Sequence, residues 1–345
     1  DHCTRLCHAS SVAALMEGVG SGAVSAPFTA ADDSDCILII GARPEQNHPV
    51  AATYFKQAAK RGANLIIMDV RKQGIMRLAN FPVIFNAGTD VAILNAMLYT
   101  IIEEKLYDKQ YIQSNIEGFE ALSEKIKDFS PENMSEICNV DPIYIRKIAR
   151  TFAKSEKSII FWGMGISQHT HGTDNARCLI ALSLITGHIG RPGTGLHPLR
   201  GQNNVQGASD AGLIPMVYPN YQSVEDPNIR NLYEDFWGVK LDPNKGLTVV
   251  EIMNEVNKKN IKALYVQGEN PAMSDPNQNH AREALSKLDH LVVQDIFFTE
   301  TANFADVILP ASAQPEKPGT YTNSNRQIQL AMPVRKPPGM AMQDW

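Results

Sequence analysis

Residues 200–209 form the most polar stretch of the chain, with the sequence Arg-Gly-Gln-Asn-Asn-Val-Gln-Gly-Ala-Ser. The stretch combines one cation with side-chain amides and glycines and has almost no apolar content. Amides donate and accept hydrogen bonds without carrying charge, and glycine lets the backbone turn and approach a ligand closely. Such a segment is either a solvated loop or the lining of a polar-ligand site. Its place between two α/β halves favours the ligand site, because loops at such junctions hold ligands.

A second candidate for chemistry is the sequence Cys3-Thr-Arg-Leu-Cys7-His8 near the start of the chain. A thiol beside an imidazole can act as a nucleophile, bind a soft metal, or lie buried without a chemical role. The spacing is not a standard zinc arrangement, and no second Cys/His pair follows at a suitable distance. From these residues alone, the three interpretations stay open.

The other histidines and cysteines have simpler explanations. We expect His169 and His171 to be loop residues after a strand, where they could face a ligand, and His280 and His290 to lie at the surface. Three cysteines lie in or beside apolar segments and are expected in the core: Cys36, Cys138 and Cys178.

Short apolar runs that end in glycine or aspartate predict buried parallel strands. We expect strands at residues 36–40, 65–68, 82–85, 158–162, 263–266, 291–294 and 307–309. We expect helices near residues 12–16, 51–61, 94–104, 174–186, 249–257 and 283–288, and two or three more between 118 and 154. Asp90 is expected to cap one helix, and Asp141 another that has Pro142 at its first position. The alternation predicts an α/β fold with two doubly wound, Rossmann-like parallel-sheet domains.

The two halves share a pattern at their first strands. In the first half, Gly41-Ala-Arg-Pro44 follows a strand and Asp69 ends the next strand; in the second half, Gly268-Glu-Asn-Pro271 and Asp295 repeat this arrangement at nearly the same spacing. A tight turn followed by an acid at the next strand end is how nucleotide-binding folds hold a phosphate and then a ribose or base. Neither copy has the G-x-G-x-x-G spacing, which disfavours ordinary NAD binding. A duplicated fold whose acids only cap helices is the alternative.

Composition limits the class of protein. The chain has 345 residues, which suggests two domains, and a net charge of -5 without a basic run, which argues against nucleic-acid binding. No apolar run is long enough to span a membrane. Five scattered cysteines argue for a reducing compartment, so we expect a cytoplasmic location. Because the chain starts at Asp1 without an initiator Met, we expect it to be part of a longer protein.

Taken together, these motifs resemble the catalytic subunit of molybdenum- or tungsten-dependent formate dehydrogenases, members of the molybdopterin oxidoreductase family. The resemblance covers nearly the whole chain and is carried, in order, by Cys7-His8, residues 41–49, Asp69-Val-Arg71, Trp162-Gly-Met-Gly165, residues 200–207 and Gln294-Asp295. It implies a bis(molybdopterin guanine dinucleotide) cofactor with molybdenum or tungsten, one dinucleotide in each α/β half. It further implies a first domain at residues 1–202 with a metal-ligand loop at 1–30, a second domain at 203–315, and a polar, Pro-rich tail at 316–345.

The resemblance also implies roles for individual residues. Cys7 would be the protein ligand of the metal, where many relatives carry selenocysteine; His8 would take or relay a proton; and Arg200 would bind the formate carboxylate through two charge-assisted hydrogen bonds. The first dinucleotide would contact Arg43, Asn47, Asp69, Arg71, Gly88, Asp90, Met164, Gln168, Gly201 and Gln202. The second would contact Gly268, Glu269, Asn270, Ser274, Gln294 and Asp295.

The implied activity is the two-electron oxidation of formate to CO2, or the reverse, with electrons passing through a 4Fe-4S cluster to iron–sulfur partner subunits. The cysteines that hold this cluster in the family and the C-terminal domain that covers both dinucleotides have no counterpart here, and Arg43 stands where relatives often have Asn. Whether hydrogen leaves formate as hydride or as a proton stays open. Two alternatives remain: a cysteine-ligated nitrate reductase of the same family, and a cofactor-free electron-transfer scaffold related to a respiratory NADH dehydrogenase subunit. His8, Arg200 and the two acids speak for formate dehydrogenase.

Overall fold

The computed structural model describes all residues, 1–345. The chain forms two compact units. We call Cys7–Gln202 with Ser324–Arg326 the N-terminal unit, and Asp1–Leu6, Asn203–Asn323 and Gln327–Trp345 the C-terminal unit. Asp1–Leu6, which we expected in the first domain, therefore belongs to the C-terminal unit. None of the helices is both long enough and apolar enough to cross a bilayer.

The N-terminal unit is built on a five-stranded parallel sheet with the order β3-β2-β1-β4-β5. Its strands are β1 (Cys36–Ile40), β2 (Asn64–Asp69), β3 (Phe81–Ile84), β4 (Ser158–Trp162) and β5 (Gly195–Pro198). All five residues of β1 are buried, and so are all five of β4, as expected for central strands covered on both faces. In this order the strands run outward in both directions from β1, which places the ligand crevice at the carboxyl ends of β1 and β4.

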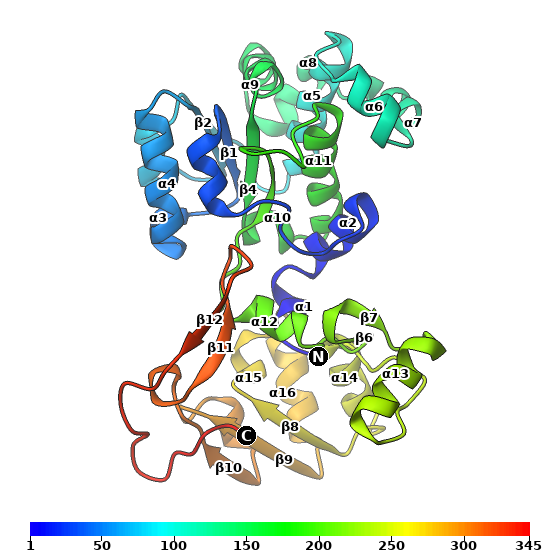
Figure 1. Cartoon of the computed structure of the whole chain (residues 1–345), viewed down its shortest axis with the longest axis vertical. Coiled ribbons are helices and arrows are strands. Elements are labelled where there is room, and N and C mark those ends of the chain that lie inside the picture. The colour runs from blue at the N-terminus through cyan, green and yellow to red at the C-terminus, as the bar shows by residue number, and fades with distance from the viewer. The chain divides into compact units, whose positions relative to one another are not determined.

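Helices cover both faces of this sheet (Figure 1). They are α2 (Ala9–Val19), α3 (Pro44–Asn47), α4 (Pro49–Lys60), α5 (Asp90–Glu103), α6 (Lys109–Asn115), α7 (Phe119–Lys125), α8 (Pro131–Cys138), α9 (Pro142–Lys154), α10 (Met164–Ser167) and α11 (Gly172–Ile185). The short helix α1 (Thr4–Cys7) precedes them, and the 3-10 helices are Phe28–Asp33, Gly74–Leu78 and Ile126–Asp128.

Alternate residues of each strand face opposite cores. Leu38 and Ile40 of β1 pack with α5 and α11, whereas Ile37 and Ile39 pack with Phe55 of α4. Each fully buried side chain of this size contributes roughly 1.5–3 kcal/mol of hydrophobic stabilisation. The two cores together fix the sheet, and the sheet fixes the turns at its carboxyl edge.

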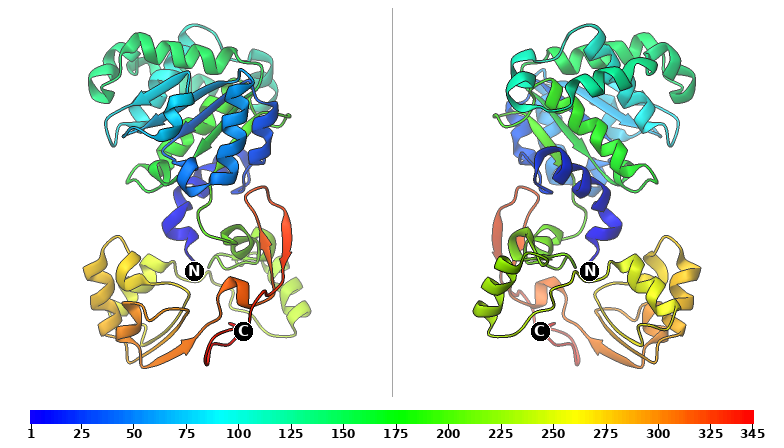
Figure 2. Two further views of the ribbon diagram at one scale, coloured as in Figure 1. Left: turned by 90° about the vertical axis from the view of Figure 1, so that its left-hand side faces the viewer. Right: turned by 90° about the vertical axis from the view of Figure 1, so that its right-hand side faces the viewer.

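The C-terminal unit contains a three-stranded parallel sheet with the order β10-β9-β8. Its strands are β8 (Ala263–Gln267), β9 (His290–Asp295) and β10 (Val307–Pro310), and its helices are α12 (Val205–Asp210), α13 (Pro227–Trp237), α14 (Val249–Asn257), α15 (Pro271–Ser274) and α16 (Gln278–Ser286). Leu285 of α16 packs with Val266 of β8 and Val293 of β9, and Figure 2 shows α14 and α16 against one side of these strands. Small antiparallel pairs join β6 (Val217–Tyr218) to β7 (Gln222–Ser223) and β11 (Gly319–Thr322) to β12 (Ile328–Ala331). The 3-10 helices of this unit are Pro219–Tyr221, Thr301–Phe304 and Gln314–Glu316.

The α/β class and the parallel sheets are confirmed, and every expected strand is present. Two local predictions differ from the structure. Thr89, whose side chain makes no capping hydrogen bond, is the residue before α5, and Asp90 is the first residue of the helix. The segment after Pro315, expected to be a polar tail, forms the β11–β12 pair within the C-terminal unit, apart from Ser324–Arg326.

Candidate functional site

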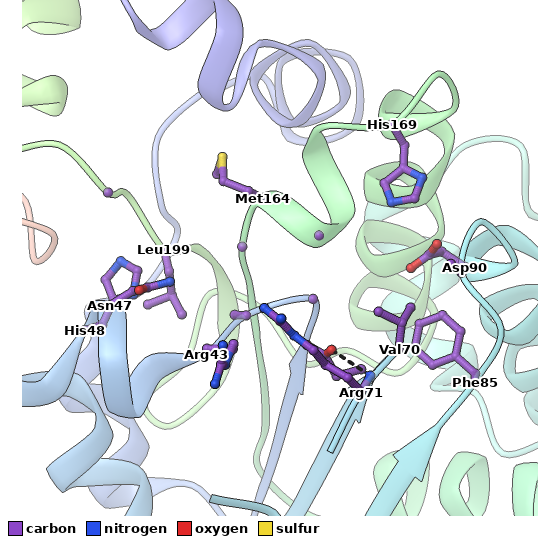
Figure 3. Close-up of a pocket in the computed structure, with 17 residues that line it drawn as sticks. Arg43, Asn47, His48, Val70, Arg71, Phe85, Asp90, Met164, His169 and Leu199 are labelled. Carbon is purple, nitrogen blue, oxygen red and sulfur yellow. Dashed lines mark hydrogen bonds between the residues drawn. The ribbon is translucent and has the colours of Figure 1, made fainter. Parts of the chain in front are cut away.

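A cavity of about 680 Å³ lies in the N-terminal unit, at the carboxyl ends of its central strands. The turns after β1, β2 and β4 line it. Figure 3 shows Arg43, Asn47 and His48 on one side of this cavity and Asp90 and His169 on the other. Its volume falls within the range of ordinary small-molecule and cofactor pockets, about 300–1,000 Å³. We call it the first pocket.

Glycines let two turns meet at the edge of the first pocket. Gly41 has a φ of 57°, which only glycine adopts without strain, and a Cβ on Gly165 would lie 2.7 Å from the Gly41 Cα. The Gly165 N–H donates to the Gly41 carbonyl over 3.0 Å, which joins the turns directly. A side chain at either position would push the turns apart and change the shape of the pocket.

Asp69 lies at the end of β2 with both carboxylate oxygens in use. Oδ1 accepts the Arg71 backbone N–H at 3.1 Å, and Oδ2 accepts the Gln73 side-chain amide. Gln73 also donates to the Ala42 carbonyl, which ties the end of β2 to the turn after β1. Each carboxylate oxygen has two lone pairs, so Asp69 retains acceptor capacity toward the pocket.

Several buried polar atoms of the residues that line the first pocket lack a partner within the protein. Among them are Oδ2 of Asp90 and Nε of Arg43. Burial raises the pKa of the Asp90 carboxyl, and nearby His169 partly opposes this increase. A buried acceptor and a buried donor without partners are costly unless a ligand supplies the missing hydrogen bonds, so both atoms indicate a polar ligand.

A second cavity of about 650 Å³, the second pocket, lies in the C-terminal unit at the carboxyl ends of β8 and β9. All six residues predicted for the second dinucleotide line it: Gly268, Glu269, Asn270, Ser274, Gln294 and Asp295. Residues that sequence reasoning missed also contribute, among them Phe297, Lys317 and Tyr321. Burial raises the pKa of Glu269, and the neighbouring carboxylates Asp275 and Asp295 raise it further.

The duplicated sequence pattern corresponds to duplicated geometry. Gly41 has a φ of 57° and donates its N–H to the residue before Asp69, while Gly268 has a φ of 62° and donates to the residue before Asp295. Asp295 Oδ1 accepts the backbone N–H two residues later at 3.0 Å, as Asp69 Oδ1 does. In both units the turn leads into a one-turn helix with proline at its start, α3 and α15. The two pockets therefore present the same backbone arrangement to a ligand.

Cys7, His8 and Arg200 come together near Met164 in the N-terminal unit. The Cys7 Sγ is buried and lies 3.4 Å from the Met164 Sδ. Burial raises the pKa of the Cys7 thiol, whereas the Arg200 charge and the Gly201 backbone N–H favour the thiolate. A thiolate is a soft, anionic donor that can bind a metal. No group of three or more His, Cys, Asp or Glu side chains that could hold a metal ion is present in the structure.

Both ring nitrogens of His8 are engaged. Nε2 lies 2.9 Å from the Leu199 carbonyl oxygen and Nδ1 lies 3.0 Å from the Ser167 hydroxyl. The ring is fully buried, and burial together with the Arg200 charge lowers the pKa of His8 to about 3. The imidazole is therefore neutral at ordinary pH.

Arg200 is the one permanent cation in a group of buried basic side chains. Its Nη2 donates to the Gly22 carbonyl at 3.1 Å. Burial lowers the pKa of His48 and, to about 4, that of His197; the Arg200 charge contributes to the lowering at His197. A buried cation beside neutral imidazoles attracts an anion, because the surrounding low dielectric strengthens their interaction.

Of the residues predicted to contact the first dinucleotide, most line the first pocket and some do not. Arg43, Asn47, Asp69, Arg71, Asp90, Met164 and Gly201 line the first pocket, whereas Gly88, Gln168 and Gln202 do not. The lining residues that were missed include His48 and Phe85, and His169, expected as a loop histidine that could face a ligand, also lines the pocket. For His48 the available signal was its position after Asn47 and before Pro49, at the start of a helix beside the predicted turn.

The chain resembles known proteins along its whole length. A family model described as molybdopterin oxidoreductase matches residues 1–345. F420-dependent formate dehydrogenase subunit alpha of Methanocaldococcus jannaschii is 46% identical over 100% of this chain and 51% of the relative. Formate dehydrogenase H of Escherichia coli is 38% identical over 100% of this chain and 48% of the relative.

Among solved structures, acetylene hydratase from Pelobacter acetylenicus matches with a TM-score of 0.78 and 25% identity, covering 99% of this chain and 49% of that one. The chain spans about half the length of the curated relatives it matches. Because the family model covers every residue, including both pockets and the cluster of Cys7, His8 and Arg200, the chain belongs to the molybdopterin oxidoreductase family.

Proposed function

We propose that this chain is the part of a formate dehydrogenase catalytic subunit that oxidises formate to CO2. The observation that carries the proposal is the buried cluster in which the Cys7 thiol lies within the electrostatic reach of a single permanent cation, Arg200. Relatives named formate dehydrogenase align with the whole of this chain, which supports the choice of formate as the anion. Formate is a small carboxylate, and a guanidinium can donate two parallel hydrogen bonds to it.

The residues present fit a metal bis(molybdopterin guanine dinucleotide). The two pockets have similar volumes, about 680 and 650 Å³, and repeat the same turn and acid, as a pair of similar dinucleotides requires. Arg43 Nε and Asp90 Oδ2 are buried polar atoms that such a ligand would satisfy. Asp69 and Arg71 would hold one guanosine, and Asp295 and Asn270 would hold the other. Met164 would contact the first pterin. Gly88, Gln168 and Gln202 would contact the first dinucleotide from positions beside the pocket.

Cys7 would bind the metal as a thiolate, because a coordinating thiol loses its proton. When bound, the metal–pterin group would supply a two-electron acceptor. Formate oxidation breaks the C–H bond and yields CO2, one proton and two electrons. Arg200 would orient the carboxylate so that this C–H bond faces the reacting centre, and the buried surroundings would exclude water. His8 Nε2 lies 2.9 Å from the Leu199 carbonyl oxygen, and in the tautomer with its proton on Nε2 the imidazole would support this arrangement.

The complete protein would pass electrons through a 4Fe-4S cluster, with ligands outside this chain, to iron–sulfur partner subunits. The relatives support a multi-subunit arrangement, since one is named a subunit alpha. That relative is named F420-dependent, which makes F420 one candidate acceptor for the whole complex. We propose a cytoplasmic location and a domain boundary at residues 202–203.

The test is the cofactor content and activity of the full-length protein, purified without oxygen from a host that makes the cofactor. We expect molybdenum or tungsten by elemental analysis, with about two pterins per metal by fluorescence, because each pocket would take one pterin dinucleotide. We also expect formate to reduce an artificial dye, which avoids dependence on the natural acceptor.

Three outcomes would contradict the proposal. Reduction of nitrate without oxidation of formate would identify the nitrate reductase alternative. Hydration of acetylene without formate oxidation would place the chain beside its structural neighbour in chemistry as well as in fold. A protein with no metal and no pterin would be the cofactor-free scaffold, and Cys7 would be an ordinary buried thiol.

A further inference from the structure

The backbone on both sides of Arg200 is held by hydrogen bonds from buried side chains. The Leu199 carbonyl accepts from His8 Nε2 at 2.9 Å, and the Arg200 carbonyl accepts from His48 Nε2 at 2.6 Å. The Leu199 N–H donates to the Trp162 carbonyl at 2.8 Å, which fixes the same peptide from its other side. Two consecutive carbonyls therefore depend on two imidazole N–H groups.

A chain of four hydrogen bonds determines which nitrogen of His8 carries its proton. Trp162 Nε1 lies 2.8 Å from Ser11 Oγ, Ser11 Oγ lies 2.7 Å from Ser167 Oγ, and Ser167 Oγ lies 3.0 Å from His8 Nδ1. All members are at least 90% buried, so solvent does not compete for these bonds.

The direction of this chain follows from its two ends. An indole N–H can only donate and a carbonyl oxygen can only accept. Trp162 therefore donates to Ser11, Ser11 donates to Ser167, Ser167 donates to His8 Nδ1, and His8 Nε2 donates to the Leu199 carbonyl. Each hydroxyl has one proton, so this is the arrangement in which every member of the chain is satisfied.

We infer that Ser167 is a positioning residue for formate binding, which acts through His8 and the Leu199 carbonyl on Arg200. The inference rests on the proposed function of Arg200. Without the Ser167 hydroxyl, the proton of His8 is free to move to Nδ1, and Nε2 then presents a lone pair to the Leu199 oxygen. That contact is repulsive, so the peptide before Arg200 loses its anchor and the guanidinium loses its fixed direction.

The experiment compares Ser167→Ala with a matched control, Ser183→Ala, in the holoenzyme. Ser183 is also a fully buried helical serine of the N-terminal unit, and its hydroxyl donates to the His188 carbonyl, away from Arg200. We expect Ser167→Ala to raise the KM for formate roughly three- to tenfold, as for one lost buried hydrogen bond, with a much smaller change in kcat. Ser167→Thr, which keeps the hydroxyl, should restore most of the affinity, and Ser183→Ala should leave the KM unchanged.

A second readout does not depend on turnover. Hydrogen–deuterium exchange of the peptide that contains residues 196–202 reports whether the Leu199 N–H is still protected. We expect faster exchange of this peptide in Ser167→Ala, and also in Ser11→Ala, which interrupts the same chain one bond earlier. Ser183→Ala should exchange at the wild-type rate in this peptide. If Ser167→Ala does not fold, Ser11→Ala provides both measurements.

The two kinds of failure are distinguishable. If Ser167→Ala and Ser11→Ala match Ser183→Ala in both formate KM and exchange, the positioning role is wrong while formate oxidation stands. If the wild-type holoenzyme does not oxidise formate, the proposed function fails, and with it the link to formate. Hydrogen–deuterium exchange would then test only whether the hydrogen-bond chain anchors residues 199–200. An exchange rate that is unchanged in Ser167→Ala and Ser11→Ala would refute this anchoring role as well.

Discussion

Arg200 gains its importance from the neutrality of the histidines around it. His8 and His197 have pKa values lowered by burial to about 3 and about 4, so neither competes with Arg200 for an anion near neutral pH. A lone guanidinium in such surroundings binds a carboxylate by geometry as well as by charge, since its donors lie in one plane. Lysine carries the charge but lacks the planar pair of donors.

We therefore expect Arg200→Lys to raise the formate KM by roughly tenfold to a hundredfold, the effect of one to two charge-assisted hydrogen bonds. Steady-state kinetics of the holoenzyme measure this change. Arg191→Lys is the control, because Arg191 donates to the backbone carbonyls of Gly187 and Glu156 instead. A formate KM equal to that of the wild type would remove Arg200 from substrate binding.

Buried neutral histidines also make stability depend on pH. Burial, together with the nearby charge of Arg191, lowers the pKa of His188 to about 4, while the unfolded chain keeps a value near 6.5. As pH falls below about 6.5, the unfolded state binds the proton first, so the free energy of unfolding decreases until about pH 4. The loss is about 1.4 kcal/mol per pH unit for one such group.

His188→Asn should remove this contribution. We expect the decrease in the free energy of unfolding between pH 7 and pH 5 to become smaller by about 2 kcal/mol than in the wild type. Denaturant unfolding at both pH values measures the difference. The matched control, His171→Asn, changes an exposed histidine and should leave the pH dependence as it was; equal behaviour of the two variants would contradict the role of His188.

At the scale of helices and strands, the sequence best predicted the elements whose structure depends on a local pattern of residue types. The apolar run of β1 and the Asp141–Pro142 start of α9 are where the pattern placed them, because a buried strand and an N-cap each have a local signal. The missed strand β5 (Gly195–Pro198) contains glycine and proline and is a strand only because it pairs with β4. Helix α13 was also missed, although its sequence carries local signals. Asp226 caps it before Pro227, and Ile229, Leu232, Tyr233 and Phe236 recur at helical spacing.

The residues of the site also divide into those that have a local sequence signal and those that do not. Asp69 and Asp295 could be predicted because strand ends and the spacing of glycines are visible in the sequence. The contacts of His8 with Ser167 and Leu199 join residues more than 150 positions apart and leave no periodic trace. His48 was missed for the same reason, since its partner is the carbonyl of Arg200.

The close approach of the turns after β1 and β4 leads to a prediction about the packing of these elements. A methyl group at Gly165 would lie 2.7 Å from the Gly41 Cα, against backbone that cannot move without distorting β1. We expect Gly165→Ala to lower the free energy of unfolding by roughly 1–3 kcal/mol, as overpacking does, and to reduce pterin content. Thermal unfolding and pterin fluorescence measure both effects.

Gly74→Ala is the control, because its new methyl group would meet only the Glu45 side chain, at 3.5 Å, an ordinary contact distance. This variant should keep wild-type stability to within about 0.5 kcal/mol, as exposed substitutions usually do. If Gly165→Ala is as stable as Gly74→Ala and binds as much pterin, the turns are not packed as closely as the structure has them.

For the whole molecule, the repeated geometry predicts two nucleotide sites that act independently. Asp69 belongs to the N-terminal unit and Asp295 to the C-terminal unit, and each lines a pocket made only of residues from its own unit. Substitutions that share no partner usually have additive effects. The guanosine end of each dinucleotide should therefore be recognised by one unit without the other.

Isothermal titration of cofactor-free protein with GMP tests this independence. We expect about two sites per chain, one per pocket, and a carboxylate hydrogen bond worth about 1.5–3 kcal/mol at each. Asp69→Asn should weaken one site roughly tenfold or more and leave the other unchanged, Asp295→Asn should do the reverse, and the double variant should lose both. Asp32→Asn, which alters an exposed ion pair with Arg61, should bind like the wild type. Binding to a single site in the wild type, or loss of both sites in one single variant, would mean that the duplicated turns do not form two separate sites.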